Sequence, residues 1–273
     1  GLCFAEKKYK VICVDNDKTK VRKINNGNTI IFEKGLDKLL SKNLNKNFTI
    51  TSNLEYAVIN SDITFIAVGT PFHGNSIDLS QVKEAAKSIG KILLKKKDYH
   101  LIIVKSTVIP GTTDNTVSPI IEKYSKKKLG EEFGVGMNPE FLREGSAVND
   151  FMKPDRIVAG CNEKHSADII RRVYKPFNKA EILVTNNKTA EMIKYANNTL
   201  LATLISFSNE IGNLCSSIEN VDSLDVMKGV HFDNRISPVF KSKKIFPGII
   251  SYLNPGCGFG GSCFPKDLSA IIS

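Results

Sequence analysis

The residues best suited to chemistry lie near the C-terminal end of the chain, in a glycine-rich tract with two cysteines. Residues 256–267 read Gly-Cys-Gly-Phe-Gly-Gly-Ser-Cys-Phe-Pro-Lys-Asp. Four glycines in six residues let a backbone approach a ligand closely. A helix is expected to begin at Cys263, and a helix N-terminus favours the nucleophilic thiolate. The tract predicts a nucleophile at Cys263, with a glycine-rich loop carrying an inert cysteine as the alternative.

Two further pairs of polar residues have a spacing of four. Lys194 and Asn198 fall in one helical pattern, so they share a face and can point into one pocket; a surface pair is the alternative. Glu140 and Glu144 belong to Asn-Pro-Glu-Phe-Leu-Arg-Glu-Gly at 138–145, just past an expected strand. These two carboxylates could act on one substrate, or they could cap a helix.

Other candidates follow expected strands directly. Asp15 ends the first strand, and Val-Gly-Thr-Pro at 68–71 and Lys-Ser-Thr-Val at 105–108 each follow a later one. Open α/β sheets bind ligands at the carboxyl ends of their strands, where an acid after the first strand can accept hydrogen bonds from a nucleotide ribose. The alternatives are a helix cap or turn at Asp15 and ordinary turns at the other two segments.

The elements that must position these residues alternate in the first half of the chain. Short β-branched runs are followed by amphipathic patterns, which is typical of a parallel sheet covered by helices. The run 63–68 carries no charge and is expected to be buried on both faces. The fold class is therefore α/β, with a doubly wound Rossmann-like parallel sheet over residues 1–185. Expected strands are 9–15, 63–68, 101–104, 133–136, 156–159 and 181–184, and expected helices are 18–26, 82–93 and 166–174.

The pattern changes after residue 185. Apolar residues recur at helical spacing from Thr189 to about Ile218, with no proline and one glycine. One long helix of this kind is more typical of a domain link or a dimer contact than of a sheet cap. A shorter helix over 223–230 and a Pro/Gly-rich tract over 237–266 follow. Residues 186–273 are predicted to form a central helical and dimerisation domain.

Composition and charge exclude several classes of protein. The chain has 273 residues, of which 41% are hydrophobic and 24% charged, so disorder and collagen-like repeats are excluded. The net charge of +10 comes from lysines spread along the chain, and the lysine runs 95–97 and 126–128 each close a helical pattern. Nucleic-acid binding is therefore not expected, although a basic binding module remains an alternative.

Neither a membrane span nor a structural metal is expected. No run reaches the roughly 18 apolar residues that a spanning helix needs, and no secretory signal precedes the first strand, so a cytoplasmic protein is expected. The six cysteines are scattered and are expected to be free thiols. No metal is expected, because Cys257 and Cys263 have no partner pair or histidine cluster.

Taken in order along the chain, these motifs resemble the nucleotide-sugar 6-dehydrogenases. The resemblance extends over essentially the whole sequence and is most specific in the cysteine tract. It rests on Cys-Phe-Ala-Glu at 3–6, Val-Gly-Thr-Pro at 68–71, Lys-Ser-Thr-Val at 105–108, the segment 138–145, Lys194 with Asn198, Asp-Asn-Arg at 233–235, and the segment 258–267.

The resemblance implies oxidation of the sugar C6 alcohol to a carboxylate with two NAD per turnover. Cys263 matches the family nucleophile, which forms a thiohemiacetal and then a thioester. Lys194 would stabilise the oxyanion with help from Asn198. Asp267 would act with Lys194 and water in proton transfer, and Glu140 would be the acid or base for thioester hydrolysis.

The same resemblance assigns the binding residues. Asp15 and Lys20 match the contacts to the adenosine ribose, and Val68, Thr70 and Ser106 lie along the NAD cleft. Thr107 and Glu144 would line the site and bind the ordered water or the nicotinamide ribose. The resemblance also assigns Thr107 a catalytic role. Arg235 matches a residue that reaches the sugar nucleotide across a dimer interface, and 246–256 matches the substrate loop. The expected substrate contacts are Glu140, Phe141, Leu142, Lys194, Asn198, Arg235, Tyr252 and Gly260.

Two parts of the family pattern are missing, and they shape the remaining expectations. The first strand with its Gly-x-Gly-x-x-Gly loop and the C-terminal UDP-binding domain are not present, so an internal fragment, inactive by itself, is expected. Phe259 and Phe264 favour UDP-glucose over GDP-mannose as the substrate, and 138–145 disfavours UDP-N-acetylmannosamine. The alternatives are a β-hydroxyacid dehydrogenase, which would not depend on Cys263, and a non-catalytic truncated paralogue that dimerises.

Overall fold

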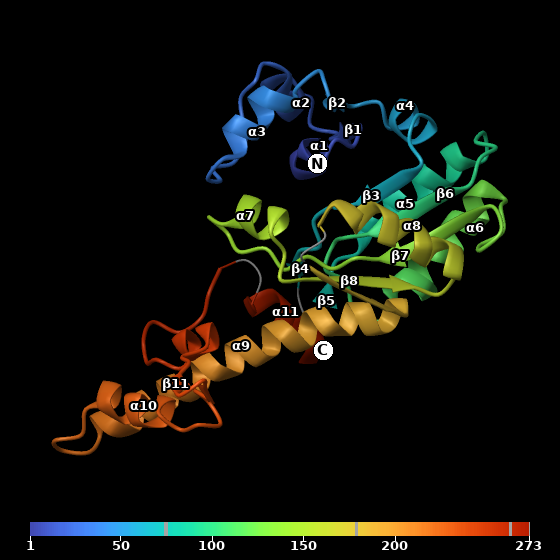
Figure 1. Cartoon of the computed structure of the whole chain (residues 1–273). Helices are drawn as coiled ribbons and strands as arrows, with labels where there is room; N and C mark the ends of the chain where they lie inside the picture. Colours follow the sequence, from blue (N-terminus) through green and yellow to red (C-terminus); the bar gives the residue numbers. More distant parts are fainter. Residues whose placement is uncertain (74–75, 178–179, 262–263, 273) are drawn as a thin grey trace. The chain divides into compact units, whose positions relative to one another are not determined.

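The computed structural model describes residues 1–73, 76–177, 180–261 and 264–272 (Figure 1). The chain divides into two compact units. The first consists of residues 1–71 and 77–194, and the second of residues 72–76 and 195–273.

A five-stranded sheet forms the centre of the first unit. The three strands that come first in the chain are parallel, as expected for an α/β fold, and β8 is antiparallel to β7 and parallel to β9. Strand periodicity carries no direction, so the reversal at β8 could not be read from the sequence. The order is β3 (Ile63–Ile66), β6 (His100–Val104), β7 (Phe133–Met137), β8 (Arg156–Cys161) and β9 (Glu181–Thr185).

Burial along the strands follows their place in this sheet. Every residue of β6 and β7 is buried, whereas Ile63, Thr64 and Phe65 of β3 are only half-buried. The expected burial of 63–68 on both faces is therefore wrong for β3, because β3 lies at one end of the five-stranded order. The two wholly buried strands, β6 and β7, each lie between two other strands of the sheet.

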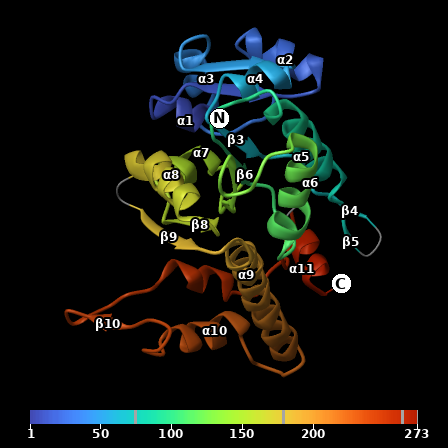
Figure 2. The same cartoon turned by 90° about the vertical axis from the view of Figure 1, so that its right-hand side faces the viewer.

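Helices cover both faces of the sheet, and alternate residues of β6 reach the two layers. Ile102 and Val104 pack in a core that includes residues of α5 (Ser80–Leu93) and α6 (Ser118–Ser125). Leu101 and Ile103 pack in another core with residues of α8 (Lys164–Tyr174). Figure 2 shows α5 and α6 on one side of the strands and α8 on the other.

A two-stranded parallel sheet precedes the larger one in the chain. It pairs β1 (Val11–Val14) with β2 (Phe48–Thr51). The expected strand 9–15 and helix 18–26 are confirmed as β1 and α2 (Lys18–Asn25), and the Asp17 side chain caps α2. The remaining elements of the first unit are α1 (Leu2–Glu6), α3 (Leu36–Asn43), α4 (Leu54–Ile59), η1 (Thr113–Val117), α7 (Ala147–Met152) and η2 (Lys175–Phe177).

The long helix α9 (Asn187–Ser216) is present as expected, and its residues from 195 onward belong to the second unit. Leu200, Phe207 and Leu214 are exposed at intervals of seven, whereas the polar Ser208 is buried. No described helix has the length and apolar character needed to cross a membrane. The other elements of the second unit are β4 (Phe72–His73), the short strand β5 (Ser76–Ile77) that straddles the division, α10 (Ser223–His231), β10 (Val239–Phe240), β11 (Lys243–Lys244), η3 (Gly248–Tyr252) and α11 (Phe264–Ile272).

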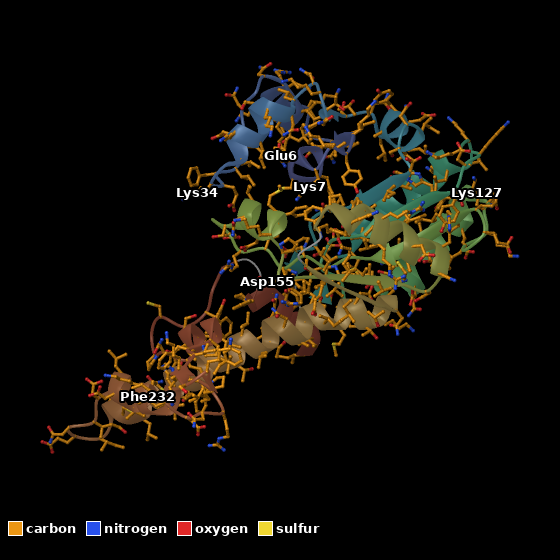
Figure 3. All side chains as sticks on the ribbon, viewed as in Figure 1. Glu6, Lys7, Lys34, Lys127, Asp155 and Phe232 are labelled. Carbon is orange, nitrogen blue, oxygen red and sulfur yellow. The ribbon has the colours of Figure 1, made fainter. Side chains whose placement is uncertain are left out.

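Two lysines from the charged runs have structural partners. The Lys96 ammonium donates to the backbone oxygens of Val58, Ile59 and Ser61 at the end of α4, and the Lys127 ammonium donates to the backbone oxygen of Lys96. Lys127 follows α6 (Figure 3). Cations are favourable at helix C-termini, so these lysines serve the fold.

Candidate active site

The loops after β3 and β6 are joined by two side-chain hydrogen bonds. The Ser106 hydroxyl donates to the Val68 backbone oxygen at 2.6 Å, and the Thr70 hydroxyl donates to the Thr107 backbone oxygen at 2.8 Å. The structure therefore brings together four of the residues that the sequence assigns to the cofactor. The hydroxyl protons are used within the loops, which fixes the backbone at this edge of the sheet.

Asp15 and Lys20 also lie close together. One Asp15 carboxylate oxygen accepts from the Asp17 backbone N–H at 2.9 Å, and the other is 3.9 Å from the Lys20 ammonium. Asp17, rather than Asp15, is the cap of α2. Because Asp15 is not the helix cap and keeps part of its side chain exposed, it can accept hydrogen bonds from a ribose diol.

Lys194 is buried and paired with Glu140. The ammonium donates to Glu140 Oε1 at 3.0 Å, and Glu140 Oε2 accepts from the Leu142 backbone N–H at 2.9 Å. The Lys194 side chain is 5% exposed, so the alternative of a surface lysine is contradicted. The Lys194 ammonium also lies 5.5 Å from the centre of the Phe141 ring. The pair brings together four residues that the sequence assigns to the site.

Glu144 lies in the same segment as Glu140 but is exposed. Of the two carboxylates spaced by four, Glu140 forms an ion pair with Lys194. The intervening Arg143 forms an ion pair with Asp150 at 2.7 Å. Within this segment, Glu140 is thus bound to the buried Lys194, whereas Glu144 is exposed to solvent.

Lys105 is a residue that sequence reasoning missed, although it opens the Lys-Ser-Thr-Val segment. Its ammonium donates to Asn138 Oδ1 at 2.9 Å, and the same oxygen accepts from the Tyr174 hydroxyl. Burial lowers the pKa of Lys105 to about 8, and it raises the pKa of Tyr174. The available signal was a lysine directly after an uncharged strand, since a cation there must find a partner.

Glu191, near the start of α9, was also missed. It is fully buried, and its carboxylate accepts from the backbone N–H groups of Gly111 and Thr113, at 2.5 and 2.8 Å, and from the Thr113 hydroxyl at 2.6 Å. Burial raises its pKa. These bonds attach the first turns of α9 to the loop before η1. The signal was an acid one turn before Lys194 on the expected helix.

In the second unit, Asn198 and Asp267 form a buried pair. The Asn198 amide donates to Asp267 Oδ2 at 2.7 Å, and the Lys266 ammonium contacts Asp267 Oδ1 at 2.6 Å. Asp267 is 1% exposed. A buried carboxylate is stable only when paired and hydrogen-bonded, and Asp267 is both. The carboxylate thus attaches α11 to α9.

The glycine-rich tract is held against α9 at its beginning as well. The Gly256 backbone N–H donates to the Asn209 side chain at 2.7 Å, and a Cβ on Gly212 would lie 2.8 Å from Pro255. Gly258 and Gly261 have positive φ, which favours glycine, and Gly260 is exposed. Cys263 lies outside the described residues, between these two attachments in the sequence.

Two further residues assigned to the substrate occupy separate places in the second unit. Tyr252 ends η3 and is half-buried. Arg235 is exposed and forms an ion pair with Asp233 at 2.6 Å, which lowers the pKa of that carboxyl to about 2. The hydrogen bonds that the structure shows for Arg235 are all with Asp233, two residues earlier in the chain. The described cysteines Cys3, Cys13, Cys161, Cys215 and Cys257 are free thiols.

Polar loops follow β3 and β6 at the carboxyl ends of parallel strands, in a sheet with helices on both faces, and Asp15 follows β1 of the smaller parallel sheet. This arrangement is typical of a dinucleotide-binding fold. The partly exposed Asp15 carboxylate is an acceptor after β1 that fits the adenosine ribose of NAD. Residues 1–178 match the UDP-glucose/GDP-mannose dehydrogenase family, NAD binding domain, and residues 188–273 match the central domain of that family. The chain belongs to this family, which decides against a β-hydroxyacid dehydrogenase.

Individual relatives with two different substrates resemble the chain. A UDP-glucose 6-dehydrogenase of Bacillus subtilis is 44% identical, over 100% of this chain and 55% of that protein. A GDP-mannose 6-dehydrogenase of Pseudomonas aeruginosa is 38% identical, over 98% and 59%. The solved UDP-glucose dehydrogenase of Pyrobaculum islandicum has a TM-score of 0.87 at 40% identity, over 99% and 59%. The chain thus spans a little over half the length of these relatives.

Proposed function

We propose that the protein containing this chain oxidises C6 of UDP-glucose to the carboxylate, forming UDP-glucuronate with two NAD per turnover. The observation that supports this best is the burial of Lys194 and Asn198, one turn apart on α9, each bound to a carboxylate. A buried ammonium and a buried amide are donors suited to a developing oxyanion. A surface pair would give no such stabilisation.

The proposed chemistry uses Cys263 as the nucleophile. NAD, when bound, accepts a hydride in each of the two oxidations. The first oxidation gives an aldehyde, to which the Cys263 thiolate adds, and the resulting thiohemiacetal is oxidised to a thioester. Water then attacks the thioester carbonyl, the C–S bond breaks, and the thiolate is released. Lys194 and Asn198 stabilise the oxyanion, while Glu140 and Asp267 accept and return protons.

The first unit supplies the residues proposed to hold NAD. Asp15 accepts from the adenosine ribose, with Lys20 beside it, and Val68, Thr70 and Ser106 line the path of the cofactor. Thr107 and Glu144 are assigned to the nicotinamide ribose or the ordered water. The domain division proposed from the sequence, 1–185 and 186–273, assigns this NAD-binding role to the first segment.

The choice of sugar rests on similarity and on the cysteine tract. The B. subtilis UDP-glucose enzyme is 44% identical and the P. aeruginosa GDP-mannose enzyme 38% identical, so GDP-mannose is the second candidate. Besides the catalytic residues, the proposed substrate contacts are Phe141, Leu142, Arg235, Tyr252 and Gly260.

We also propose that the protein forms a homodimer through α9. Leu200, Phe207 and Leu214 are each about half-exposed on one stripe of that helix. Large apolar side chains in a contiguous exposed row are typical of an interface. Arg235 is exposed as well, which suits a role in the site of a second copy.

The test of function is turnover by the intact gene product with NAD and each nucleotide sugar. We expect NADH formation with UDP-glucose at a kcat/KM at least tenfold above that with GDP-mannose, and UDP-glucuronate as the product. Equal or faster turnover of GDP-mannose would overturn the substrate assignment. Absence of turnover with both sugars by a folded, NAD-binding protein would overturn the proposed function and favour a non-catalytic relative.

A further inference from the structure

Lys105 occupies a position that none of the proposed catalytic steps uses. It follows β6 directly, and its ammonium donates to both oxygens of Asn138, at 2.9 Å to Oδ1 and at 3.3 Å to the backbone oxygen. Asn138 follows β7, the neighbouring strand in the sheet. The contact therefore joins the carboxyl ends of two inner strands.

Asn138 is almost completely buried and is held on every side. Its backbone N–H donates to Val104 at 2.9 Å, and its side-chain amide donates to the Val158 backbone oxygen at 2.7 Å. The Tyr174 hydroxyl of α8 donates to the oxygen that Lys105 also contacts. Each buried polar group of Asn138 is thus satisfied, which fixes the start of the turn that carries Glu140 two residues later.

We propose that Lys105 is a positioning residue: through Asn138 it fixes the turn that carries Glu140, and it adds a second cation beside the Glu140–Lys194 pair. The positioning of the turn by Lys105 depends only on these contacts. Its consequence for catalysis also rests on the proposed function.

The charges around Lys105 agree with this role. Burial is the main cause that lowers its pKa to about 8; the Glu140 carboxylate acts in the opposite direction, and the Lys194 ammonium lowers the pKa further. The Tyr174 hydroxyl approaches from α8. The charges of both Glu140 and Lys194 therefore act on the pKa of Lys105. Because electrostatic coupling is mutual, its own charge acts on both of them.

The structural part is tested without substrate, by NMR of lysine side chains through a pH titration of the intact protein. We expect a midpoint for Lys105 near pH 8, which falls in Glu140→Gln and rises in Lys194→Met. Lys123→Met, on α6, is the matched control and should leave the midpoint unchanged. A Lys105 midpoint at the ordinary lysine value, or one that neither variant moves, would overturn the proposal.

The catalytic part is tested with Lys105→Met and Lys105→Arg in the intact enzyme. We expect Lys105→Met to lower kcat by about ten- to a hundredfold while KM for NAD changes little, because a displaced acid–base group slows the chemical step. In Lys105→Arg, which stays charged and can still donate to Asn138, kcat should recover and any decline of kcat near pH 8 should move to higher pH. Unchanged kcat in Lys105→Met would contradict the proposal.

Tyr174→Phe separates positioning from general loss of structure. It removes one donor to Asn138 and keeps the Lys105 charge, so we expect a smaller decrease in kcat and an unchanged pH profile. The outcome that contradicts the proposal is an equal loss of kcat and of thermal stability in Lys105→Met, Lys105→Arg and Tyr174→Phe, with the same pH profile in all three. Lys105 would then have a structural role alone. If the wild type oxidises neither sugar, the proposed function fails, and the NMR titration still decides the role of Lys105.

Discussion

At the scale of single residues, the buried charged side chains Lys96, Glu191, Lys194 and Asp267 of the described residues each have partners. The Lys194 ammonium forms an ion pair with Glu140, and the Asp267 carboxylate binds Lys266 and Asn198. The Glu191 carboxylate accepts three hydrogen bonds. Removing one member of such a set leaves the other groups buried and unpaired, which costs more than the interaction itself contributes. Substitutions at these positions should therefore affect stability as well as chemistry.

Glu191 gives the clearest test of this rule. Glu191→Ala leaves two backbone N–H groups and the Thr113 hydroxyl without their acceptor, so we expect a loss of about 2–4 kcal/mol in the free energy of unfolding. Urea denaturation measures the change. Glu210→Ala, an exposed acid on the same helix, is the control and should change stability by less than about 0.5 kcal/mol. Equal effects of the two substitutions would contradict the assignment.

Lys105 predicts a dependence of stability on pH. Its pKa in the folded protein is about 8, below the ordinary 10.5, so between these values the unfolded chain binds a proton that the folded chain lacks. Stability therefore rises with pH across this window. Relative to Lys105→Met, the wild type should gain about 2–3 kcal/mol in unfolding free energy from about pH 7 to pH 10. A difference that stays constant with pH would exclude the lowered pKa.

At the scale of elements, the sequence predicts the positions of helices and strands better than their direction and their partners. The uninterrupted apolar run from Leu101 to Val104 and the spacing of the apolar residues in 82–93 were enough to predict β6 and α5. Direction and partners were not predictable from period alone, so the reversal at β8 was missed. The pairing of Lys105 with Asn138 was missed because it joins residues that only the sheet brings together.

Helix α9 shows the same limit for the candidate site. Its length and position were predicted, and so was the shared face of Lys194 and Asn198. The sequence left open whether Lys194 and Asn198 lie at the surface, and the structure buries both of them while it exposes Leu200 and Phe207. A buried polar face depends on partners such as Asp267, which lie far away in the sequence.

The Asn198–Asp267 bond should hold α11 in place. Asn198→Ala removes the donor to a buried carboxylate, so we expect amide hydrogen exchange in 264–272 to become at least tenfold faster while α5 is unaffected. Mass spectrometry of peptides after exchange measures this. Asn213→Ala, an exposed residue on the same helix, should leave both regions as in the wild type. Unchanged protection of α11 in Asn198→Ala would show that other contacts hold it.

At the scale of the whole molecule, the exposed apolar row of α9 predicts assembly. A glutamate at the centre of the row, Phe207→Glu, should convert the proposed dimer to monomers, because an unpaired charge in an apolar interface is strongly unfavourable. Light scattering coupled to size-exclusion chromatography measures the mass. Asn213→Glu adds the same charge at an exposed polar position and should leave the dimer intact. A wild-type protein that is monomeric at micromolar concentration would refute the interface.

The proposed function depends on a cysteine thiolate that binds the aldehyde from the first oxidation and carries it through the second. The direct measurement is the yield of NADH and UDP-glucuronate from UDP-glucose with the intact wild-type protein and with Cys263→Ala. We expect two NADH and one carboxylate per sugar from the wild type, and loss of carboxylate formation in Cys263→Ala, with NAD binding retained. Carboxylate formation by Cys263→Ala at the wild-type rate would contradict the account.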